Sequence, residues 1–377
     1  MRKKILFVIP EYSHGGTNKS LENLLSFLDK NKYDINIFSL YEDGGNYYKN
    51  VFAPYIVKKS VLYYFLHDNV VSRKIMGLYN MITKKKNFSW LYKREANMLQ
   101  SKYHYNTIIA YQEGTATTFV SYITGNVKKI AWVHCDYKDW AKSSQQKKDK
   151  LTYSSFTKVV CVSETAKESF CKVLPEYTYK STTVYNTLDI ERIKILSLQT
   201  ISLPYPKNYY FNILSVGRLS KVKQFDIIPS IVNRMGKDNI KKIKWYIIGD
   251  GIEKEKIKKE INKQNLENNI ILLGSKDNPY PYFKSVNLYV CTSDSESFSY
   301  TIFESKILHT PVLSNNFPVA YEVIEKNCGW VCSLDRVHNL LTDMINDKDN
   351  IYSKVKKNIE TYEYDNKRII QQIEELL

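Results

Sequence analysis

The stretch from residue 287 to residue 312 reads NLYVCTSDSESFSYTIFESKILHTPV. Its first five residues form a short apolar run, which predicts a buried strand. Residues 299–308 then alternate polar and apolar side chains with near-helical spacing, and Thr310-Pro311 ends that pattern. The stretch therefore predicts a strand, a serine-rich loop and a helix in succession, which is the repeating unit of a parallel α/β sheet.

The loop and the start of this helix carry groups that suit a hydroxyl-rich anion. Glu296 lies in the loop, and Glu304 lies about one turn into the expected helix. Because Ser295, Ser297 and Ser299 are small, a ligand can approach the backbone N–H groups at the positive end of the helix, where phosphate binds readily. One carboxylate for hydroxyl groups, amides for a phosphate and a second carboxylate further in together suit a nucleotide sugar.

Length and composition set limits on the rest of the chain. The 377 residues favour two domains, and 43% hydrophobic with 25% charged residues is typical of globular proteins. The formal net charge of +16 favours an anionic partner. No signal-peptide pattern opens the chain, and no apolar run could span a bilayer, so we expect a cytoplasmic protein. The six cysteines have no CxxC spacing, which predicts reduced thiols.

The first half contains a series of strand-like runs separated by helical patterns. These runs cover residues 4–10, 33–40, 105–111, 129–133, 158–163 and 182–185. Gly15-Gly16 follow the first run, where they either bring backbone amides close to an anion or make a tight turn. Glu113 follows the third run, and His134 and Asp136 follow the fourth. Since ligands of α/β sheets bind at the carboxyl ends of strands, these side chains are expected at a cleft.

Residues 55–92 are rich in aromatic and basic side chains. Tyr64 and Phe65 precede Arg73 and the run Lys84-Lys85-Lys86. Helical patterning with this composition suits a surface that contacts anionic lipid headgroups. A pair of ordinary helices with solvated lysines remains the alternative.

A proline-containing connection at residues 200–208 precedes a second α/β series. Strands are expected at residues 210–216, 245–248, 270–273, 287–291, 311–314 and 330–332, and a helix within residues 359–377. Arg218 and Lys223 lie in the loop after the first of these strands. At an effective dielectric near 20, one charge pair at 4 Å is worth about 4 kcal/mol. Two fixed cations and helix-end amides could therefore stabilise a departing diphosphate without a metal.

Together these segments resemble glycosyltransferase family 4, the retaining enzymes of GT-B architecture, over most of the chain. The resemblance is most specific in the second half, where Gly217-Arg218-Leu219 with Lys223, Phe225 and Asp226 matches a family loop and Gly249-Asp250-Gly251 matches a family turn. Glu296 through Glu304 matches the E-x7-E signature. In the first half, Gly15-Gly16 matches a glycine-rich loop, and Trp132-Val133-His134 matches the strand that bears an active-site histidine.

The resemblance implies roles for individual residues. It implies catalytic roles for Glu296, His134, Arg218 and Lys223. It also implies donor contacts from Gly15, Gly16, Arg218, Lys223, Asp250, Ser275, Glu296, Ser297, Phe298, Ser299 and Glu304. Arg218 and Lys223 would hold the diphosphate, Glu304 the ribose and Glu296 the transferred sugar. Ser297 and Ser299 stand where many members have glycine, and Asp136 is one residue beyond the usual His-Asp pair.

The implied fold is two Rossmann-like, doubly wound parallel-sheet domains facing each other across a cleft. We expect an acceptor-binding domain at residues 1–203, a nucleotide-sugar domain at 204–355 and a C-terminal helix at 356–377 that returns to the first domain. The implied function is retaining, metal-independent transfer from a UDP-sugar, favoured over GDP-mannose, to a glycan or lipid-linked acceptor in bacterial surface polysaccharide synthesis. The expected setting is the inner membrane face, with no nucleic-acid partner.

Two alternatives stay open at this point. A nucleotide-sugar epimerase shares the two-domain architecture but needs no acceptor. A non-catalytic partner protein could use the same fold to bind a glycan or to stabilise a glycosyltransferase. The sequence leaves the linkage, the acceptor and the oligomeric state undetermined.

Overall fold

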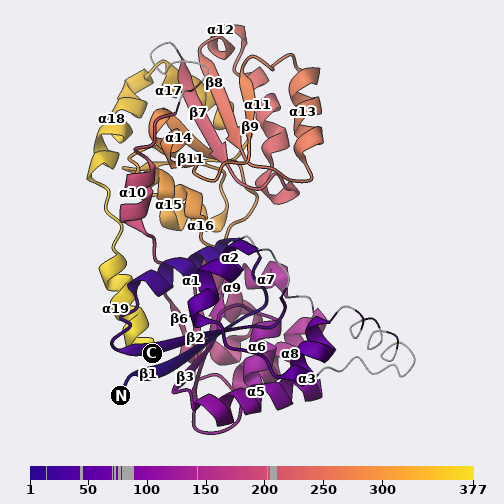
Figure 1. Ribbon diagram of the computed structural model, residues 1–377. Helices are drawn as coiled ribbons and strands as arrows, with labels where there is room; N and C mark the ends of the chain where they lie inside the picture. The colour runs from indigo at the N-terminus through magenta and orange to yellow at the C-terminus, as the bar shows by residue number, and fades with distance from the viewer. Residues whose placement is uncertain are drawn as a thin grey trace. The chain divides into compact units, whose positions relative to one another are not determined.

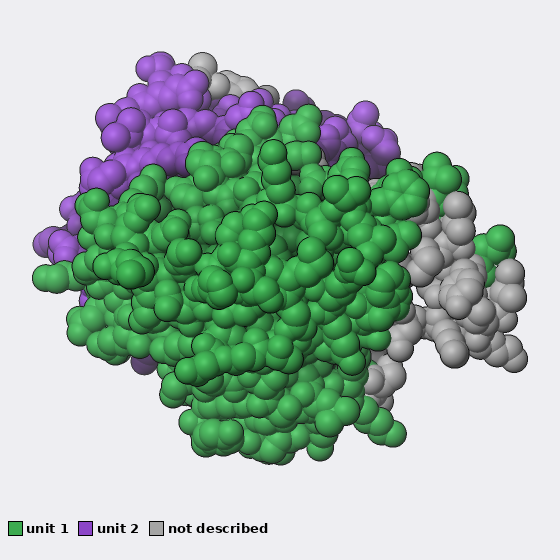
Figure 2. Space-filling model, turned by 60° about the horizontal axis from the view of Figure 1, so that its bottom comes forward, with its two compact units in different colours: residues 1–188, 366–377 green, residues 189–365 purple. Residues whose placement is uncertain are grey.

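The computed structural model divides the chain into two compact units (Figures 1 and 2). Unit 1 contains Met1–Leu188 and Asn366–Leu377, and unit 2 contains Asp189–Asp365. The structure describes residues 1–13, 15–42, 46–69, 71, 74, 78, 89–141, 143–201, 203 and 210–377. The proposed proline connection at Pro204 and Pro206, together with Arg73 and the run Lys84-Lys85-Lys86, lies outside the described residues.

Unit 1 is built on a parallel six-stranded sheet in the order β2-β1-β3-β4-β5-β6. The strands are β1 (Lys3–Ile9), β2 (Tyr33–Ser39), β3 (Thr107–Ala110), β4 (Lys128–Val133), β5 (Lys158–Cys161) and β6 (Ser181–Thr183). The α-helices are α1 (Gly16–Phe27), α2 (Asn46–Phe52), α3 (Val61–Tyr63), α5 (Ser89–Tyr103), α6 (Thr115–Ser121), α7 (Tyr137–Trp140), α8 (Ser143–Ser154), α9 (Glu164–Val173) and α19 (Asn366–Leu376). Short helical turns are η1 (Ala53–Tyr55), the π-helical η2 (Tyr64–Asp68) and η3 (Pro175–Lys180).

Unit 2 contains a second parallel six-stranded sheet in the order β12-β11-β10-β7-β8-β9. Its strands are β7 (Phe211–Val216), β8 (Ile243–Ile248), β9 (Ile270–Gly274), β10 (Leu288–Cys291), β11 (Val312–Ser314) and β12 (Gly329–Val331). The α-helices are α10 (Ile190–Leu196), α11 (Ile228–Arg234), α12 (Lys237–Ile240), α13 (Lys254–Lys263), α14 (Tyr280–Ser285), α15 (Tyr300–Ile307), α16 (Pro318–Val323), α17 (Val337–Ile345) and α18 (Ile351–Asn358). Single turns are η4 (Lys221–Lys223), η5 (Phe225–Ile227), η6 (Lys348–Asn350) and η7 (Ile359–Thr361).

Both sheets form because their central strands are predominantly apolar, as parallel sheets covered by helices on both faces require. In β1 the last five residues are all buried, and in β8 all six are. The largest described part of the core of unit 2 lies where α11, α13 and α17 pack against β8 and its neighbours. Helices α10, α14 and α15 contact one another and lie together in Figure 1. The twelve expected strands and the two-sheet architecture are confirmed.

The limits of the units differ from the expected boundaries at 203/204 and 355/356. Helix α10 belongs to unit 2, because it packs on α14 and α15 and because Asn278 donates a hydrogen bond to the Leu196 carbonyl at 2.9 Å. Helix α19 belongs to unit 1, where Ile369 and Ile373 are buried and Thr107 Oγ1 donates to the Leu377 carbonyl at 3.0 Å.

Candidate functional site

The loops after β7, β8 and β9 are joined by backbone hydrogen bonds into one rigid platform. Leu219 N–H donates to the Asp250 carbonyl at 2.9 Å, and Gly249 N–H donates to the Gly274 carbonyl at 3.0 Å. Gly217 N–H donates to the Ile248 carbonyl at 3.0 Å. The loop that carries Arg218 and Lys223 is therefore held against the end of β8, which is in turn joined to the end of β9.

Glycine is required in this platform because backbones approach each other closely. A Cβ atom on Gly249 would lie 1.9 Å from the Gly217 carbonyl oxygen, and one on Gly251 would lie 2.4 Å from that of Leu219. Both separations are far shorter than any real contact, and both neighbours are backbone atoms that cannot turn aside. The G-D-G turn is therefore a packing requirement of this loop.

Lys223 and Arg218 lie on the same loop but in different environments. Arg218 is exposed, whereas the Lys223 side chain is 22% exposed. Thr292 Oγ1 donates to the Lys223 carbonyl at 2.6 Å, which ties the loop to the end of β10. Burial and the charge of Arg218 both lower the pKa of Lys223, but the carboxylate of Glu296 outweighs them and holds this pKa above its ordinary value. Lys223 is therefore a fixed, protonated cation.

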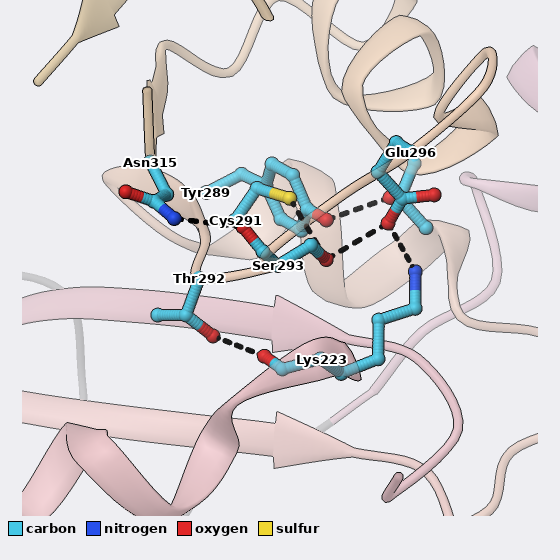
Figure 3. Close-up of polar contacts among 8 residues, drawn as sticks. Lys223, Tyr289, Cys291, Thr292, Ser293, Glu296 and Asn315 are labelled. Atoms are coloured by element: carbon cyan, nitrogen blue, oxygen red, sulfur yellow. Dashed lines mark hydrogen bonds and ion pairs between the residues drawn. The ribbon is translucent and has the colours of Figure 1, made fainter. Parts of the chain in front are cut away.

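Glu296 is the partner of Lys223, and a chain of hydrogen bonds holds it in place. Figure 3 shows Lys223 and Ser293 converging on the Glu296 carboxylate. Lys223 Nζ forms an ion pair with Glu296 Oε1, and Ser293 Oγ donates to the same oxygen at 2.8 Å. Asn315 Nδ2 in turn donates to the Ser293 carbonyl at 2.9 Å. The loop between β10 and α15 thus presents one carboxylate in a fixed position beside a fixed cation.

Helix α15 begins directly after Ser299, whose backbone is left-handed, with φ of 61°. Ser299 is buried, and its hydroxyl has no hydrogen-bond partner among the described residues. Phe298 stacks on Phe303 at a centroid distance of 4.6 Å and packs edge-on against Tyr300. Aromatic packing therefore anchors the first turn of α15. The Ser299 side chain makes no capping hydrogen bond there.

The left-handed backbone explains why glycine suits position 299. It also predicts how substitutions of Ser299 change the free energy of unfolding. A β-branched residue with positive φ is a steric outlier, so Ser299→Val is expected to lower the free energy of unfolding by about 2 kcal/mol. Ser299→Gly is expected to be at least as stable as the parent protein, because glycine adopts this conformation without strain. Denaturant unfolding of both variants measures the difference. Equal free energies of unfolding for the valine and glycine variants would contradict backbone strain at residue 299.

Glu304 lies within α15 and is 2% exposed. Tyr280 on α14 donates a hydrogen bond from its hydroxyl to Glu304 Oε1 at 3.2 Å. Burial raises the pKa of Tyr289 well above its ordinary value, and the charges of Glu296 and Glu304 both raise it further. Both signature carboxylates therefore lie close to the same phenol, which hydrogen-bonds Thr301 at 2.6 Å.

The other predicted donor contacts of unit 2 lie at its loops. Asp250 is exposed, and its carboxylate accepts hydrogen bonds from Gly251 N–H at 2.8 Å and from Lys254 Nζ at 3.0 Å. Ser275 is exposed directly after β9, and Ser297 is partly buried in the loop before α15. The carboxylate of Asp250 thus stabilises the turn and the start of α13, while Ser275 is open to solvent.

In unit 1 the predicted residues lie at the carboxyl ends of β1 and β4. Gly15 has an extended backbone, and a Cβ atom there would have no neighbour within 4 Å. Gly16 opens α1. His134 packs on Tyr111 at a centroid distance of 4.9 Å, and its Nε2 is buried without a hydrogen-bond partner in the described part of the chain. Burial lowers the pKa of His134 to about 3, so the imidazole is neutral at neutral pH.

Glu113 and Asp136, whose roles the sequence left open, have structural partners. Glu113 is buried, and its Oε2 accepts a hydrogen bond from His134 N–H at 2.9 Å, which ties the end of β3 to the end of β4. Asp136 caps α7 by accepting from Lys138 N–H at 3.1 Å, and it also accepts from the Ser169 hydroxyl. Asp136 therefore shapes the loop that follows His134.

Three further features of the described residues concern possible metal ligands, helix length and thiols. In those ranges no three or more His, Cys, Asp or Glu side chains are grouped as a metal site requires. No helix in the same ranges is both long and apolar enough to cross a membrane. All six cysteines are described, and all are free thiols.

Sequence reasoning missed the residues that position the predicted ones. Ser293, Thr292 and Asn315 hold Glu296 and Lys223, and Tyr280 holds Glu304. Thr292 and Asn315 directly follow buried strands and Ser293 is one residue further on, so their polar side chains at strand ends were a usable signal. Tyr280 has no such signal, because α14 is distant in sequence from the E-x7-E stretch.

Known proteins resemble this chain in two ways, in the sequence of most of unit 2 and in the fold. Residues 205–362 match the protein family described as Glycosyl transferases group 1. The chain also resembles HepE of Anabaena, solved in complex with UDP, with a TM-score of 0.72 at 16% identity over 99% of this chain and 98% of that one. The chain has the GT-B fold. The expected fold class is confirmed, and at this identity the likeness of the GT-B structures shows the fold alone.

Two curated relatives are similar over part of this GT-B chain. An uncharacterized glycosyltransferase of Methanocaldococcus jannaschii is 31% identical over 206 residues, which are 52% of this chain and 49% of that protein. The N-acetylgalactosamine-N,N'-diacetylbacillosaminyl-diphospho-undecaprenol 4-alpha-N-acetylgalactosaminyltransferase of Campylobacter jejuni is 34% identical over 122 residues, 32% of this chain and 31% of that protein. The matches thus span half or less of these curated relatives.

Proposed function

We propose that this GT-B protein is a retaining glycosyltransferase that moves a sugar from a nucleotide diphosphate sugar to a glycan or lipid-linked acceptor. The observation that carries the proposal is the arrangement in unit 2, where Lys223 is a fixed cation beside Glu296 in the loop that leads into α15. A cation, a carboxylate and a helix amino end in one loop system suit a diphosphate attached to a sugar.

Each predicted residue has a proposed role. Arg218 and Lys223 hold the diphosphate, Glu304 accepts hydrogen bonds from the ribose, and Glu296 accepts them from the transferred sugar. Phe298 and Ser299 offer backbone N–H groups, and the buried, unpartnered hydroxyl of Ser299 supports a ligand at this end of α15. Further donor contacts are proposed for Gly15, Gly16, Asp250, Ser275 and Ser297.

The proposed reaction takes place on one face of the sugar. The bond between the anomeric carbon and the diphosphate oxygen breaks, and a bond from the acceptor oxygen to that carbon forms. The acceptor hydroxyl proton passes to the departing diphosphate, whose charge is stabilised by Arg218 and Lys223. We propose that neutral His134 acts at the reacting sugar through Nε2, since a buried polar atom without a partner suits a substrate hydroxyl. The proposed reaction needs no metal.

UDP is the proposed nucleotide, and surface polysaccharide assembly is the proposed setting. The HepE structure contains UDP, and the name of the Campylobacter relative specifies a diphospho-undecaprenol acceptor. These statements concern those proteins, and they support a UDP-sugar and a lipid-linked acceptor for this chain. We further propose a location on the inner face of the cell membrane.

A panel of UDP- and GDP-sugars tests the proposal most broadly. The full chain is incubated with each sugar in EDTA, with and without acceptor, and nucleotide release, sugar products and melting temperature are measured. The proposal predicts stabilisation by UDP and acceptor-dependent transfer, since a ligand that binds the folded state raises its stability. An epimerised free nucleotide sugar would favour the epimerase alternative. No binding and no turnover would favour a non-catalytic partner.

Unit 1 carries a basic pocket that supports contact with an anionic membrane. The pocket measures about 490 Å³ and lies between residues 58–60 and one face of α5. Arg94, Met98 and Lys102 follow one another at four-residue intervals on α5, so they share a stripe of the helix. Tyr64 and Phe65, in the turn that follows α3, are each 55% exposed.

The neighbouring Tyr63 has a different role. It is fully buried and packs against Phe38, Phe119 and Tyr92, so it belongs to the core of unit 1. The aromatic character of residues 55–92 is thus divided between core residues and exposed ones.

Vesicle binding tests the membrane contact. Each basic residue near an acidic surface is worth about 1 kcal/mol, so Arg94→Ala with Lys102→Ala is expected to weaken binding to phosphatidylglycerol vesicles by about 30-fold. Lys258→Ala with Lys259→Ala, two exposed lysines of α13, is the matched control for charge. Sedimentation with phosphatidylglycerol and with phosphatidylcholine vesicles measures both variants. An equal loss in both double variants would contradict a dedicated surface on unit 1.

A further inference from the structure

The two side chains of unit 2 that the proposed function assigns to different parts of the donor are paired with each other. Lys223, assigned to the diphosphate, forms an ion pair with Glu296, assigned to the sugar. Both side chains are mostly buried, with 22% and 15% of their surfaces exposed. In this arrangement the two groups therefore neutralise each other's charge.

A diphosphate that approaches Lys223 meets the carboxylate of Glu296 as a competing anion. An ammonium between a carboxylate and a phosphate would hold two anions close together in a partly buried site, where like charges repel strongly. Water cannot fully screen the repulsion, because neither side chain is well exposed. The repulsion therefore favours the separation of Lys223 from the carboxylate as the diphosphate arrives.

We infer that donor binding exchanges the partner of Lys223, so that the diphosphate replaces the carboxylate of Glu296 and thereby releases this carboxylate to accept hydrogen bonds from the sugar. This inference rests on the proposed function and adds a coupling to it. The ion pair keeps the sugar-binding carboxylate occupied until a diphosphate is present. A free sugar without a diphosphate meets a carboxylate that is already paired.

Ser293 is the positioning residue of this exchange. Its hydroxyl donates to Glu296 Oε1, the same oxygen that Lys223 contacts, and its own carbonyl accepts from Asn315 Nδ2 at 2.9 Å. Ser293 is 1% exposed, so neither bond competes with bulk water. When Lys223 leaves, the Ser293 hydroxyl still holds one carboxylate oxygen, which keeps Glu296 near its place for the incoming sugar (Figure 3).

Calorimetric titration with UDP tests the exchange apart from catalysis. Glu296→Gln keeps the size of the side chain but removes the competing charge, so UDP is expected to bind about tenfold tighter. The same variant is expected to transfer sugar at least about 100-fold more slowly, because it lacks the carboxylate for the sugar hydroxyls. A variant that binds the nucleotide better and transfers worse is the signature of the exchange.

The matched control is a second lysine–glutamate pair of unit 2. Lys306 Nζ lies 2.6 Å from Glu325 Oε2 and also donates to the Val323 carbonyl at 2.6 Å. Glu325→Gln removes a lysine–glutamate pair whose carboxylate is 51% exposed, and it is expected to leave UDP affinity unchanged. Melting curves of both variants confirm that each is folded before it is titrated.

The exchange and the proposed function fail in different ways. If the parent protein binds UDP but Glu296→Gln binds it equally or more weakly, the exchange is wrong and the proposed function stands. If the parent protein binds neither UDP nor GDP and turns over no nucleotide sugar, the proposed function itself is wrong, and the exchange is wrong with it.

Ser293→Ala provides a second, independent measurement. It removes the bond to Glu296 without changing any charge, so UDP affinity is expected to stay within about threefold while kcat falls about tenfold. A purely structural role for Ser293 would instead lower the melting temperature and affect binding and turnover together. Unchanged kcat in a folded Ser293→Ala variant would overturn the positioning role.

Discussion

Changing Arg218 and Lys223 together to glutamine is expected to lower kcat/KM for the nucleotide sugar by about 10,000-fold, since each fixed group aimed at developing charge is typically worth about 100-fold or more. Both residues lie on the loop after β7, which backbone hydrogen bonds hold against the end of β8 and the loop after β10. Because this platform is rigid, the charges need no reorganisation when the diphosphate departs. Nucleotide release by the purified full chain, with saturating acceptor, measures the effect.

Two features of this experiment separate charge from folding. Lys258→Gln with Lys259→Gln removes the same two charges from the exposed side of α13 and is expected to retain parental activity. Lys223→Gln leaves Glu296 without its cation, so the melting temperature of the double variant is recorded and assays are run well below it. Turnover at the parental rate in the folded double variant would refute a phosphate-binding role for both residues.

Gly249→Ala is expected to lower the free energy of unfolding of unit 2 by about 3 kcal/mol or more, the range in which overpacking and strain effects are found. The added Cβ would lie 1.9 Å from the Gly217 carbonyl oxygen, and this oxygen belongs to the backbone of the neighbouring loop. Relief of the clash requires the Gly217 and Gly249 loops to separate, which disrupts hydrogen bonds such as that from Gly217 N–H to the Ile248 carbonyl. Denaturant unfolding of the variant gives the size of the loss.

Gly236→Ala is the matched control for this loss. Gly236 has a φ of 81°, and a Cβ there would have no neighbour within 4 Å. Its ψ is 154°, so its backbone is in a region that essentially only glycine adopts, and alanine at this position carries only that strain, roughly 1–3 kcal/mol. Equal destabilisation by the two substitutions would show that the close approach at Gly249 does not limit stability.

The fold was predictable because most strands of the two sheets are predominantly apolar, as β1 and β8 illustrate. Parallel strands covered by helices on both faces need such sequences, and the turn residues between them, such as Gly15 after β1 and Gly249 after β8, mark where strands end. The boundary between the two units was harder to predict from the sequence. The apolar residues of helix α10 would suit packing against either unit. Only its observed packing on α14 and α15 assigns it to unit 2.

The candidate site was predictable in its residue types and less so in its contacts. Lys223 and Glu296 are recognisable from their places at strand ends, but their pairing depends on side-chain positions that spacing does not determine. Asp136 illustrates the same limit. Its sequence position next to His134 suggests chemistry, whereas its carboxylate caps α7. Tyr63 and Tyr64 are neighbours in sequence, yet one is buried and the other exposed, because only the three-dimensional packing fixes which face of the turn meets the core.

The central claim is that the loop after β7 and the amino end of α15 hold a diphosphate within unit 2. A crystal structure of the full chain with UDP tests it most directly. The account predicts diphosphate oxygens about 3 Å from the side-chain nitrogens of Arg218 and Lys223 and from backbone N–H groups at the start of α15. A bound UDP whose diphosphate lies away from these groups, with both basic side chains turned toward solvent, would contradict it.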